Sequence, residues 1–330
     1  MLLLGIGAVL WGGGLYMTRG PHIQFSGVKP SSETLTPLAS HLRTHVTKLA
    51  GDIGERNVFT KGSLKKAEAY LTGVWRDQNY DVTRQEYEVQ NRDLHVADSK
   101  CANLEVVRIG TKFQKQIVVI GAHYDSVDGT VGANDNASGV AALLELSRRF
   151  AAEKHKRTVK FVAFVNEEPP FFTTGEQGSR VYAKAARVRG DDIRAMISLE
   201  TIGYYSDAKG SQKYPPVLSW FYPDVGNFLG FVSNFQSRNL MHRGLKAFRK
   251  NSDFPTQCAS TFEKIEGVGW SDHASFWAEG YKAFMVSDTA PFRYPHYHEQ
   301  TDTPDKLHYD KLARATEGLY YVITELAKGE

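Results

Sequence analysis

The hydrophobic positions of this chain begin with two helical repeats. Apolar residues recur at three- and four-residue steps between Thr34 and Leu49, which predicts a helix with one apolar stripe. A second helix is expected from Ser63, a suitable N-cap, through Val74. Three strands are predicted next, at residues 81–89, 102–108 and 116–121. The last of these is almost entirely apolar, as expected for a central strand covered on both faces.

Beyond residue 121, strands and helices alternate. Buried strands are predicted at residues 159–165, 195–199 and 283–287. Helices are predicted at residues 140–150, 176–187, 225–238, 272–278 and 304–328. Because such alternation favours a mostly parallel sheet, we predict an α/β fold. It is a single doubly wound domain with a mixed, mostly parallel central sheet flanked by helices.

Composition adds few constraints. The chain has 330 residues, of which 42% are apolar and 23% charged, with a mean hydropathy of −0.38, as in ordinary soluble domains. A net charge of +3, without a cluster of basic and aromatic residues, argues against nucleic acid as a partner. Cys101 and Cys258 are too few for a disulfide framework and lack zinc-binding spacing. They could form one disulfide after export or remain two buried thiols.

The N-terminus is strongly apolar. Residues 2–17 carry no charge, but they are short for a membrane-spanning helix, which needs about 20 residues, and they include three consecutive glycines. They also lack the basic start and cleavage site of a signal peptide. Our order of preference is a signal-anchor or uncleaved export segment, then a poorly formed signal peptide, then a buried strand. We assign residues 1–20 to this segment and residues 21–33 to a linker rich in Pro, Gly and Ser.

Side chains that bind metals follow four predicted strand ends. They are His123 with Asp125, Glu167 with Glu168, Glu200, and His296 with His298; Asp135 lies in the loop GANDNASG after the first of these strands. In open α/β sheets these ends meet at one edge, where sites form. Histidines with several carboxylates and no thiolate suit Zn²⁺, or less selectively Mn²⁺ or Co²⁺. Two ions about 3.5 to 4 Å apart can share a carboxylate and activate a water molecule.

Each of these residues also has an ordinary structural explanation. A single histidine is more often a surface or core residue than a ligand, and Asp135 could cap the following helix. Glu167 and Glu168 precede Pro169 and Pro170, as in many solvated loops. The metal site is favoured because all of these side chains come together at one sheet edge.

Six motifs occur in the order found in a known family: HYDS, GANDNASG, NEE, LETIGYY, SDHASFW and YHEQTDT. Because of these motifs, residues 34–328 resemble the family of zinc-dependent aminopeptidases that includes the bacterial secreted leucyl aminopeptidases. Glutaminyl cyclases, glutamate carboxypeptidase and the transferrin receptor are relatives. The resemblance implies a zinc-peptidase type of fold, a catalytic domain at residues 34–330 without the apical insert of larger members, and two Zn²⁺ ions.

The resemblance also implies a set of metal ligands. Asp135 would bridge the two metals, with His123 and Glu200 completing one site and Glu168 and His298 the other. Glu200 departs from the aspartate common in the secreted aminopeptidases, and its extra methylene is expected to move one metal slightly or change how the carboxylate binds it.

Other roles carried over from the family concern residues beside these ligands. Asp125 would orient the His123 ring, Glu167 would act as general base, and Tyr297 would stabilise the oxyanion. His298 is preferred to His296 because it has the family's spacing to the TDT motif. Asp272 and His273 are expected to support the site or, alternatively, to belong to a capped helix.

The function expected from this resemblance is hydrolysis of N-terminal peptide bonds in peptides or small aminoacyl compounds. A cyclase-like acyltransferase with one zinc and a non-catalytic binding protein are the alternatives. Both are disfavoured because the full ligand set and the base are present. Residues 204–265 are expected to build one wall of the substrate pocket, with candidate lining aromatics Phe171, Phe172, Trp220, Phe221, Tyr222, Trp270 and Phe276. We expect an exported protein, tethered to a membrane through residues 2–17; the oligomeric state stays open.

Overall fold

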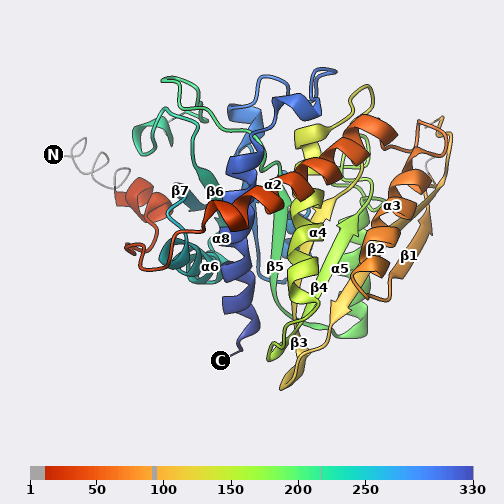
Figure 1. Cartoon of the computed structure of the whole chain (residues 1–330), viewed down its shortest axis with the longest axis horizontal. Coiled ribbons are helices and arrows are strands. Elements are labelled where there is room, and N and C mark those ends of the chain that lie inside the picture. The colour runs from red at the N-terminus through yellow and green to blue at the C-terminus, as the bar shows by residue number, and fades with distance from the viewer. Residues whose placement is uncertain (1–11, 91–94, 217, 330) are drawn as a thin grey trace.

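The structure, a computed structural model, describes residues 12–90, 95–216 and 218–329. Within these ranges one eight-stranded sheet has the order β1-β2-β4-β3-β5-β8-β6-β7, and helices pack against it (Figure 1). Its strands are β1 (Thr83–Glu88), β2 (Lys100–Arg108), β3 (Phe113–His123), β4 (Arg157–Phe164), β5 (Asp192–Glu200), β6 (Leu229–Asn234), β7 (Thr256–Thr261) and β8 (Ala283–Ser287). The neighbours β4-β3-β5-β8 are parallel, as are β6 and β7, whereas β1-β2, β2-β4 and β8-β6 are antiparallel. The predicted fold class is confirmed.

The helices divide between two apolar cores. They are α2 (Ser32–Val46), α3 (Ser63–Asp77), α4 (Gly139–Phe150), α5 (Gly178–Arg189), α6 (Arg238–Asn251), α7 (His273–Ala278) and α8 (Tyr309–Ala327), with shorter turns at Thr47–Ile53, Ala133–Ser138, Leu218–Trp220, Ala290–Phe292 and Pro304–Lys306. Along β3, Val118 and Ile120 pack into the larger core, which includes residues of α2, α3, α4, α6 and α8, whereas Ile117 and Val119 pack into a smaller core with residues of α5 and α7. Because side chains alternate across a strand, β3 is apolar on both faces, as predicted.

The helix predicted at residues 225–238 is wrong. Residues Leu229–Asn234 form β6, which pairs with β8 on one side and with β7, a strand we did not predict, on the other. The helical part starts only at Arg238. Gly230 and the buried Phe231 fit a strand between two neighbours better than a helix, and this pairing outweighs local preference.

Ser63 also differs in detail from the prediction, because the N-cap of α3 is Gly62 and Ser63 is the first helical residue. Its hydroxyl instead donates to the carbonyl of Asn57 and accepts from the amide of Asn57. The hydroxyl therefore fixes the turn before the helix.

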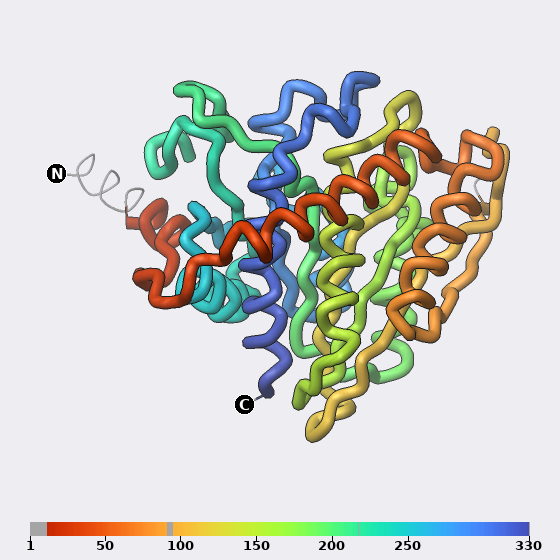
Figure 2. Tube along the Cα trace, in the orientation of Figure 1, coloured from red at the N-terminus to blue at the C-terminus, as the bar shows by residue number. Residues whose placement is uncertain are grey.

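The described part of the N-terminal segment lies against α6 and β7. Residues 12–18 are helical, and Figure 2 shows the chain continuing from them past α6 toward α2. Arg249 donates to the carbonyl of Pro21, and the amides of Ser26 and Gly27 donate to the carbonyl of Lys250. Within the described ranges no helix has both the length and the apolar character needed to cross a bilayer. Residues 1–11 of the predicted anchor lie outside the described residues.

Candidate metal centre

The five predicted ligands converge at the carboxyl end of the central strands. His123 is the last residue of β3 and Glu200 the last of β5, while Asp135 and Glu168 come from the loops after β3 and β4. His298 arrives from the loop after β8. Parallel strands that end at the same edge bring these distant residues together.

Asp135 faces a histidine with each of its two oxygens. Its Oδ1 lies 3.3 Å from Nε2 of His123, and its Oδ2 lies 3.2 Å from Nε2 of His298. The Nε2 of His123 is also 3.3 Å from Oε2 of Glu200, and that of His298 is 3.2 Å from Oε2 of Glu168. Two groups of potential ligands, His123–Asp135–Glu200 and Asp135–Glu168–His298, therefore share one carboxylate, and a third group, His123–Glu167–Glu168, lies beside them.

The chemistry of these groups fits a pair of divalent cations. Among the described residues, both ring nitrogens of His123, Oδ1 of Asp135 and Oε1 of Glu168 are buried without a hydrogen-bond partner. Buried polar atoms ordinarily have partners, and two imidazoles with three carboxylates are ligands that suit zinc. The residues present could therefore hold two Zn²⁺ ions.

Electrostatics supports the same interpretation. Burial lowers the pKa of His298, but Asp135 and Glu168 more than reverse this and raise it to about 10. Burial raises the pKa of Asp135, and the two histidines then bring it below its usual range. Burial, followed by the charge of Asp135, raises the pKa of Glu168 to about 7. The carboxylates thus require nearby positive charge, which protonated histidines or metal cations can supply.

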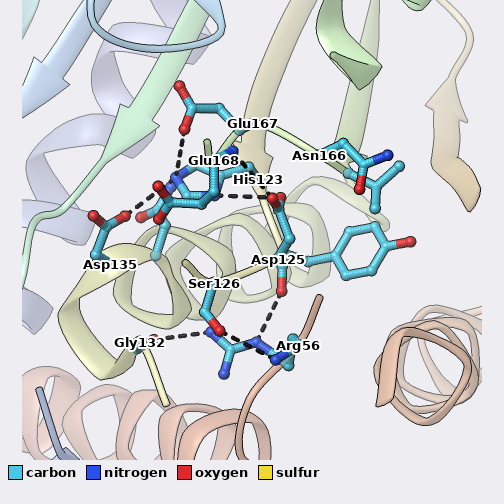
Figure 3. A network of polar contacts seen from close by, with 12 residues as sticks. Arg56, His123, Asp125, Ser126, Gly132, Asp135, Asn166, Glu167 and Glu168 are labelled. Carbon is cyan, nitrogen blue, oxygen red and sulfur yellow. Dashed lines mark hydrogen bonds and ion pairs between the residues drawn. The ribbon is translucent and has the colours of Figure 1, made fainter. Parts of the chain in front are cut away.

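Asp125 lies beside these groups, and Glu167 belongs only to the third of them. Oδ1 of Asp125 is 3.5 Å from Nδ1 of His123, and its Oδ2 accepts from the amide of Glu168 at 3.2 Å. Figure 3 shows Asp125 beneath the His123 ring and Glu167 on the other side. Oε2 of Glu167 is 3.8 Å from Nε2 of His123, farther than Asp135 or Glu200. Burial, opposed in part by His123, raises the pKa of Glu167 well above its usual value.

Glu200 has an additional support. The hydroxyl of Ser271 donates to its Oε2 at 2.7 Å, and Ser271 also pairs with Ser198 on β5. The carboxylate of Glu200 is thus held toward His123 rather than toward solvent. Ser271 belongs to the SDHASFW motif, and the structure gives it a contact with a candidate ligand.

Residues that sequence reasoning missed fix the loop around Asp135. Asp302 accepts from the amides of Asn134 and Asp135, and from the hydroxyl of Tyr294. Asn136, joined to Asp135 by a cis peptide bond, donates to the carbonyl of Leu199 and accepts from the amide of Thr201. The aspartate of the TDT motif and the second asparagine of GANDNASG are signals that could have identified Asp302 and Asn136. Arg56, also missed, lies outside all the recognised motifs.

The C-terminal loop separates the two candidate histidines. His298 points into the centre, whereas Nδ1 of His296 lies 2.7 Å from the hydroxyl of Thr301 and His296 belongs to none of the ligand groups found among the described residues. The Tyr297 ring stacks on His298 with centroids 3.9 Å apart. Burial, together with the charge of Asp135, raises the pKa of Tyr297, so its hydroxyl keeps its proton.

Asp272 and His273 are fully buried beside the centre but outside the ligand groups among the described residues. Asp272 is the N-cap position of α7, and the ring of His273 contacts Trp277 edge to face. The Nε2 atom of His273 lies 2.8 Å from the carbonyl oxygen of Val268. These contacts are consistent with supporting roles.

An apolar pocket of about 100 Å³ adjoins the centre. Glu200 and Tyr297 form part of its wall, and residues from the 204–265 segment, including Tyr214, Tyr222 and Phe231, form another. Of the seven aromatic residues considered from sequence, Tyr222 and Trp270 line it. Phe276 instead packs in the smaller core, and Phe171 in the larger one.

Residues 105–323 match the profile of Peptidase family M28. The uncharacterised protein YfbL of Escherichia coli is 41% identical over 212 residues, which cover 62% of this chain and 65% of that protein. Leucine aminopeptidase 1 of Arthroderma otae is 26% identical over 229 residues, covering 64% of this chain and 55% of the relative. The chain thus spans less than two thirds of the length of these curated relatives.

Solved structures share the fold. A zinc aminopeptidase from Bacillus subtilis superposes with a TM-score of 0.69 at 15% identity, covering 88% of this chain and 95% of the other. The glutaminyl cyclase of Fimbriiglobus ruber superposes with a TM-score of 0.63 at 19% identity, covering 93% and 98%. At these identities the likeness establishes the architecture and leaves the reaction to be inferred from the site.

Proposed function

The chain belongs to Peptidase family M28, and from this premise we propose that it is a zinc-dependent aminopeptidase. The observation that carries the proposal is the position of Asp135, whose two oxygens face two histidines. His123 and Glu200 would complete one zinc site, and Glu168 and His298 the other. Zinc bound there would lower the pKa of a water molecule toward about 7 and polarise the substrate carbonyl.

The protein's own residues would carry the proton transfers. Glu167, which lies close to the ligands, accepts the proton of the attacking water and then delivers it to the leaving amine. Asp125 keeps the His123 ring oriented through its Nδ1. Tyr297, protonated and adjacent to the centre, donates to the oxyanion of the tetrahedral intermediate.

Two features of the site support action at the free N-terminus of a substrate. Excess carboxylate charge, including that of Glu168, would attract an α-ammonium group. The adjoining pocket is lined mainly by aromatic and aliphatic side chains, among them Tyr222, Phe228 and Met285. An apolar N-terminal side chain fits such a lining because its burial is favourable.

A panel of chromogenic aminoacyl substrates, each with a free and an acetylated amino group, tests this function. We expect zinc-dependent cleavage of the free form, highest for apolar side chains, and little cleavage of the acetylated form. Equal cleavage of both forms would exclude an aminopeptidase. Formation of pyroglutamate from peptides that begin with glutamine, with one zinc per chain, would favour a cyclase instead.

We also propose that the catalytic domain acts outside the cytoplasm, held at a membrane by the apolar N-terminus. Residues 12–19 contact the domain, since Arg238 donates to the carbonyls of Tyr16 and Arg19. A deletion of residues 2–11 preserves these contacts and removes most of the apolar run. Fractionation should find the full chain in the membrane fraction and the deletion variant in the soluble fraction; the same fraction for both would contradict the tether.

A further inference from the structure

Arg56 is a buried cation bound mainly by backbone carbonyls. Its side chain is fully buried, and among the described residues no carboxylate lies within ion-pair distance of it. Nε donates to Tyr124 at 2.8 Å and Nη2 to Gly132 at 2.9 Å. Nη1 donates to the carbonyls of Leu49, Gly54 and Val131. One guanidinium therefore joins the turn after α2 to the loop after β3.

Three of the five carbonyls that Arg56 binds, those of Tyr124, Val131 and Gly132, lie in the loop that carries candidate metal ligands. Tyr124 stands between His123 and Asp125, and Gly132 comes three residues before Asp135. The backbone of Arg56 adds two bonds to the same loop, since its amide donates to the hydroxyl of Ser126 and its carbonyl accepts from the amide of Ser126. Figure 3 shows Arg56 below this loop, on the far side of Asp125 from Glu167 and Glu168. Both ends of the loop are thus fixed by one side chain.

The charge of Arg56 interacts with carboxylates of the candidate metal centre. Burial lowers its pKa to about 10, and the carboxylates of Asp125 and Asp302 are the largest opposing influences. The guanidinium therefore stays protonated at neutral pH. Burying a cation without an opposite charge nearby costs desolvation free energy. The nearby carboxylates therefore stabilise the Arg56 guanidinium, and the guanidinium in turn reduces the repulsion among the carboxylates.

We propose that Arg56 is a positioning residue that holds the loop from His123 to Asp135 in the metal-binding arrangement before metal arrives. Arg56 does this by hydrogen bonds to the loop carbonyls, with its charge as a secondary contribution. The inference rests on the proposed metal centre and does not depend on which reaction follows.

Three variants separate geometry, charge and general stability. Arg56→Met removes both the hydrogen bonds and the charge, and Arg56→Lys keeps the charge but cannot reach five carbonyls at once. Arg157→Met is the matched control. Arg157 is also buried and binds the carbonyl of Leu326, but it lies at the opposite end of β4 from the centre.

The measurements are hydrogen–deuterium exchange of the metal-free protein, zinc affinity by competition with a chelator, and the visible absorption of the Co²⁺-substituted protein. For Arg56→Met we expect exchange in residues 124–135 to be at least about tenfold faster and zinc affinity about 10- to 100-fold weaker, as for other residues that orient ligands. The Co²⁺ spectrum should change because the ligands are displaced. Arg56→Lys should resemble Arg56→Met more than the wild type, and Arg157→Met should match the wild type in all three.

An unchanged zinc affinity and Co²⁺ spectrum in Arg56→Met would overturn the proposal. Wild-type values of all three measurements in Arg56→Lys would also overturn it, because they would assign the effect to charge. If Arg56→Met does not fold, Arg56→Lys alone decides, because it keeps the charge and loses most of the carbonyl contacts. It must then weaken zinc binding several-fold, and wild-type affinity in that variant would overturn the proposal. Failure of the wild-type protein to bind zinc would instead refute the proposed function.

Discussion

Replacement of Glu167 by glutamine tests the proposed proton transfer. Oε2 of Glu167 lies 3.8 Å from Nε2 of His123, whereas Asp135 and Glu200 lie 3.3 Å from that atom. Because glutamine has nearly the same shape and Glu167 stands outside the closest ligand contacts, metal content should stay near the wild-type value. General-base catalysis contributes about 10² to 10⁴ in rate, or about 3 to 5 kcal/mol of activation free energy. We expect kcat to fall by this factor with little change in KM.

The assay measures kcat on a leucine chromogenic substrate and zinc content on the same sample. Glu299→Gln is the control, since Glu299 is exposed and adjoins His298 in sequence without belonging to the ligand groups described. A kcat within tenfold of the wild type at full zinc content would refute the general-base assignment. A loss of kcat that parallels a loss of zinc would show that Glu167 is a ligand.

Three further predictions concern stability, ligand support and the pocket. Burial raises the pKa of Glu145, but His45 and Arg148 more than offset this and lower the pKa to about 2. The ionised Glu145 therefore stabilises the fold at pH values above its unfolded-state pKa of about 4.5. This contribution disappears as the pH falls toward 2. Urea unfolding of the metal-free protein should find Glu145→Gln less stable by up to about 3 kcal/mol at pH 7, with the difference shrinking below pH 5; a difference independent of pH would contradict this. Ser271→Ala should weaken zinc binding about tenfold because Glu200 loses its donor; an unchanged affinity would remove Ser271 from the site. Met285→Trp should fill the pocket and lower kcat/KM for leucine substrates more than for alanine substrates; equal losses would place the side chain elsewhere.

The central part of the fold could be predicted because its pattern is strong. β3 and β8 are apolar runs between turn residues, and both were found close to the expected positions. β6 and β7 could not be predicted because their stability comes from pairing with β8 and with each other, not from local sequence. A short segment such as Leu229–Asn234 has no period long enough to distinguish a strand from a helix.

The candidate ligands could be predicted because several metal-binding side chains follow strand ends of one sheet and because the resemblance to a known family assigns them. Arg56 could not be predicted, since it acts through backbone carbonyls and lies outside the motifs. The TDT motif contains Asp302, but the motif alone does not show that Asp302 accepts from the amides of the Asp135 loop. Glu200, which stands where the secreted aminopeptidases commonly have aspartate, lies at the same 3.3 Å from His123 as Asp135 does. The longer side chain, held by Ser271, thus lies within ligand distance of His123 and Asp135.

A bridged pair of metals is tested most directly by the number of zinc ions that the wild-type protein and Asp135→Asn bind per chain. Because Asp135 is the carboxylate shared by two ligand groups, we expect two ions in the wild type and the loss of at least one in the variant. One zinc per chain in the wild type, or two retained by Asp135→Asn, would contradict a bridged pair of metals.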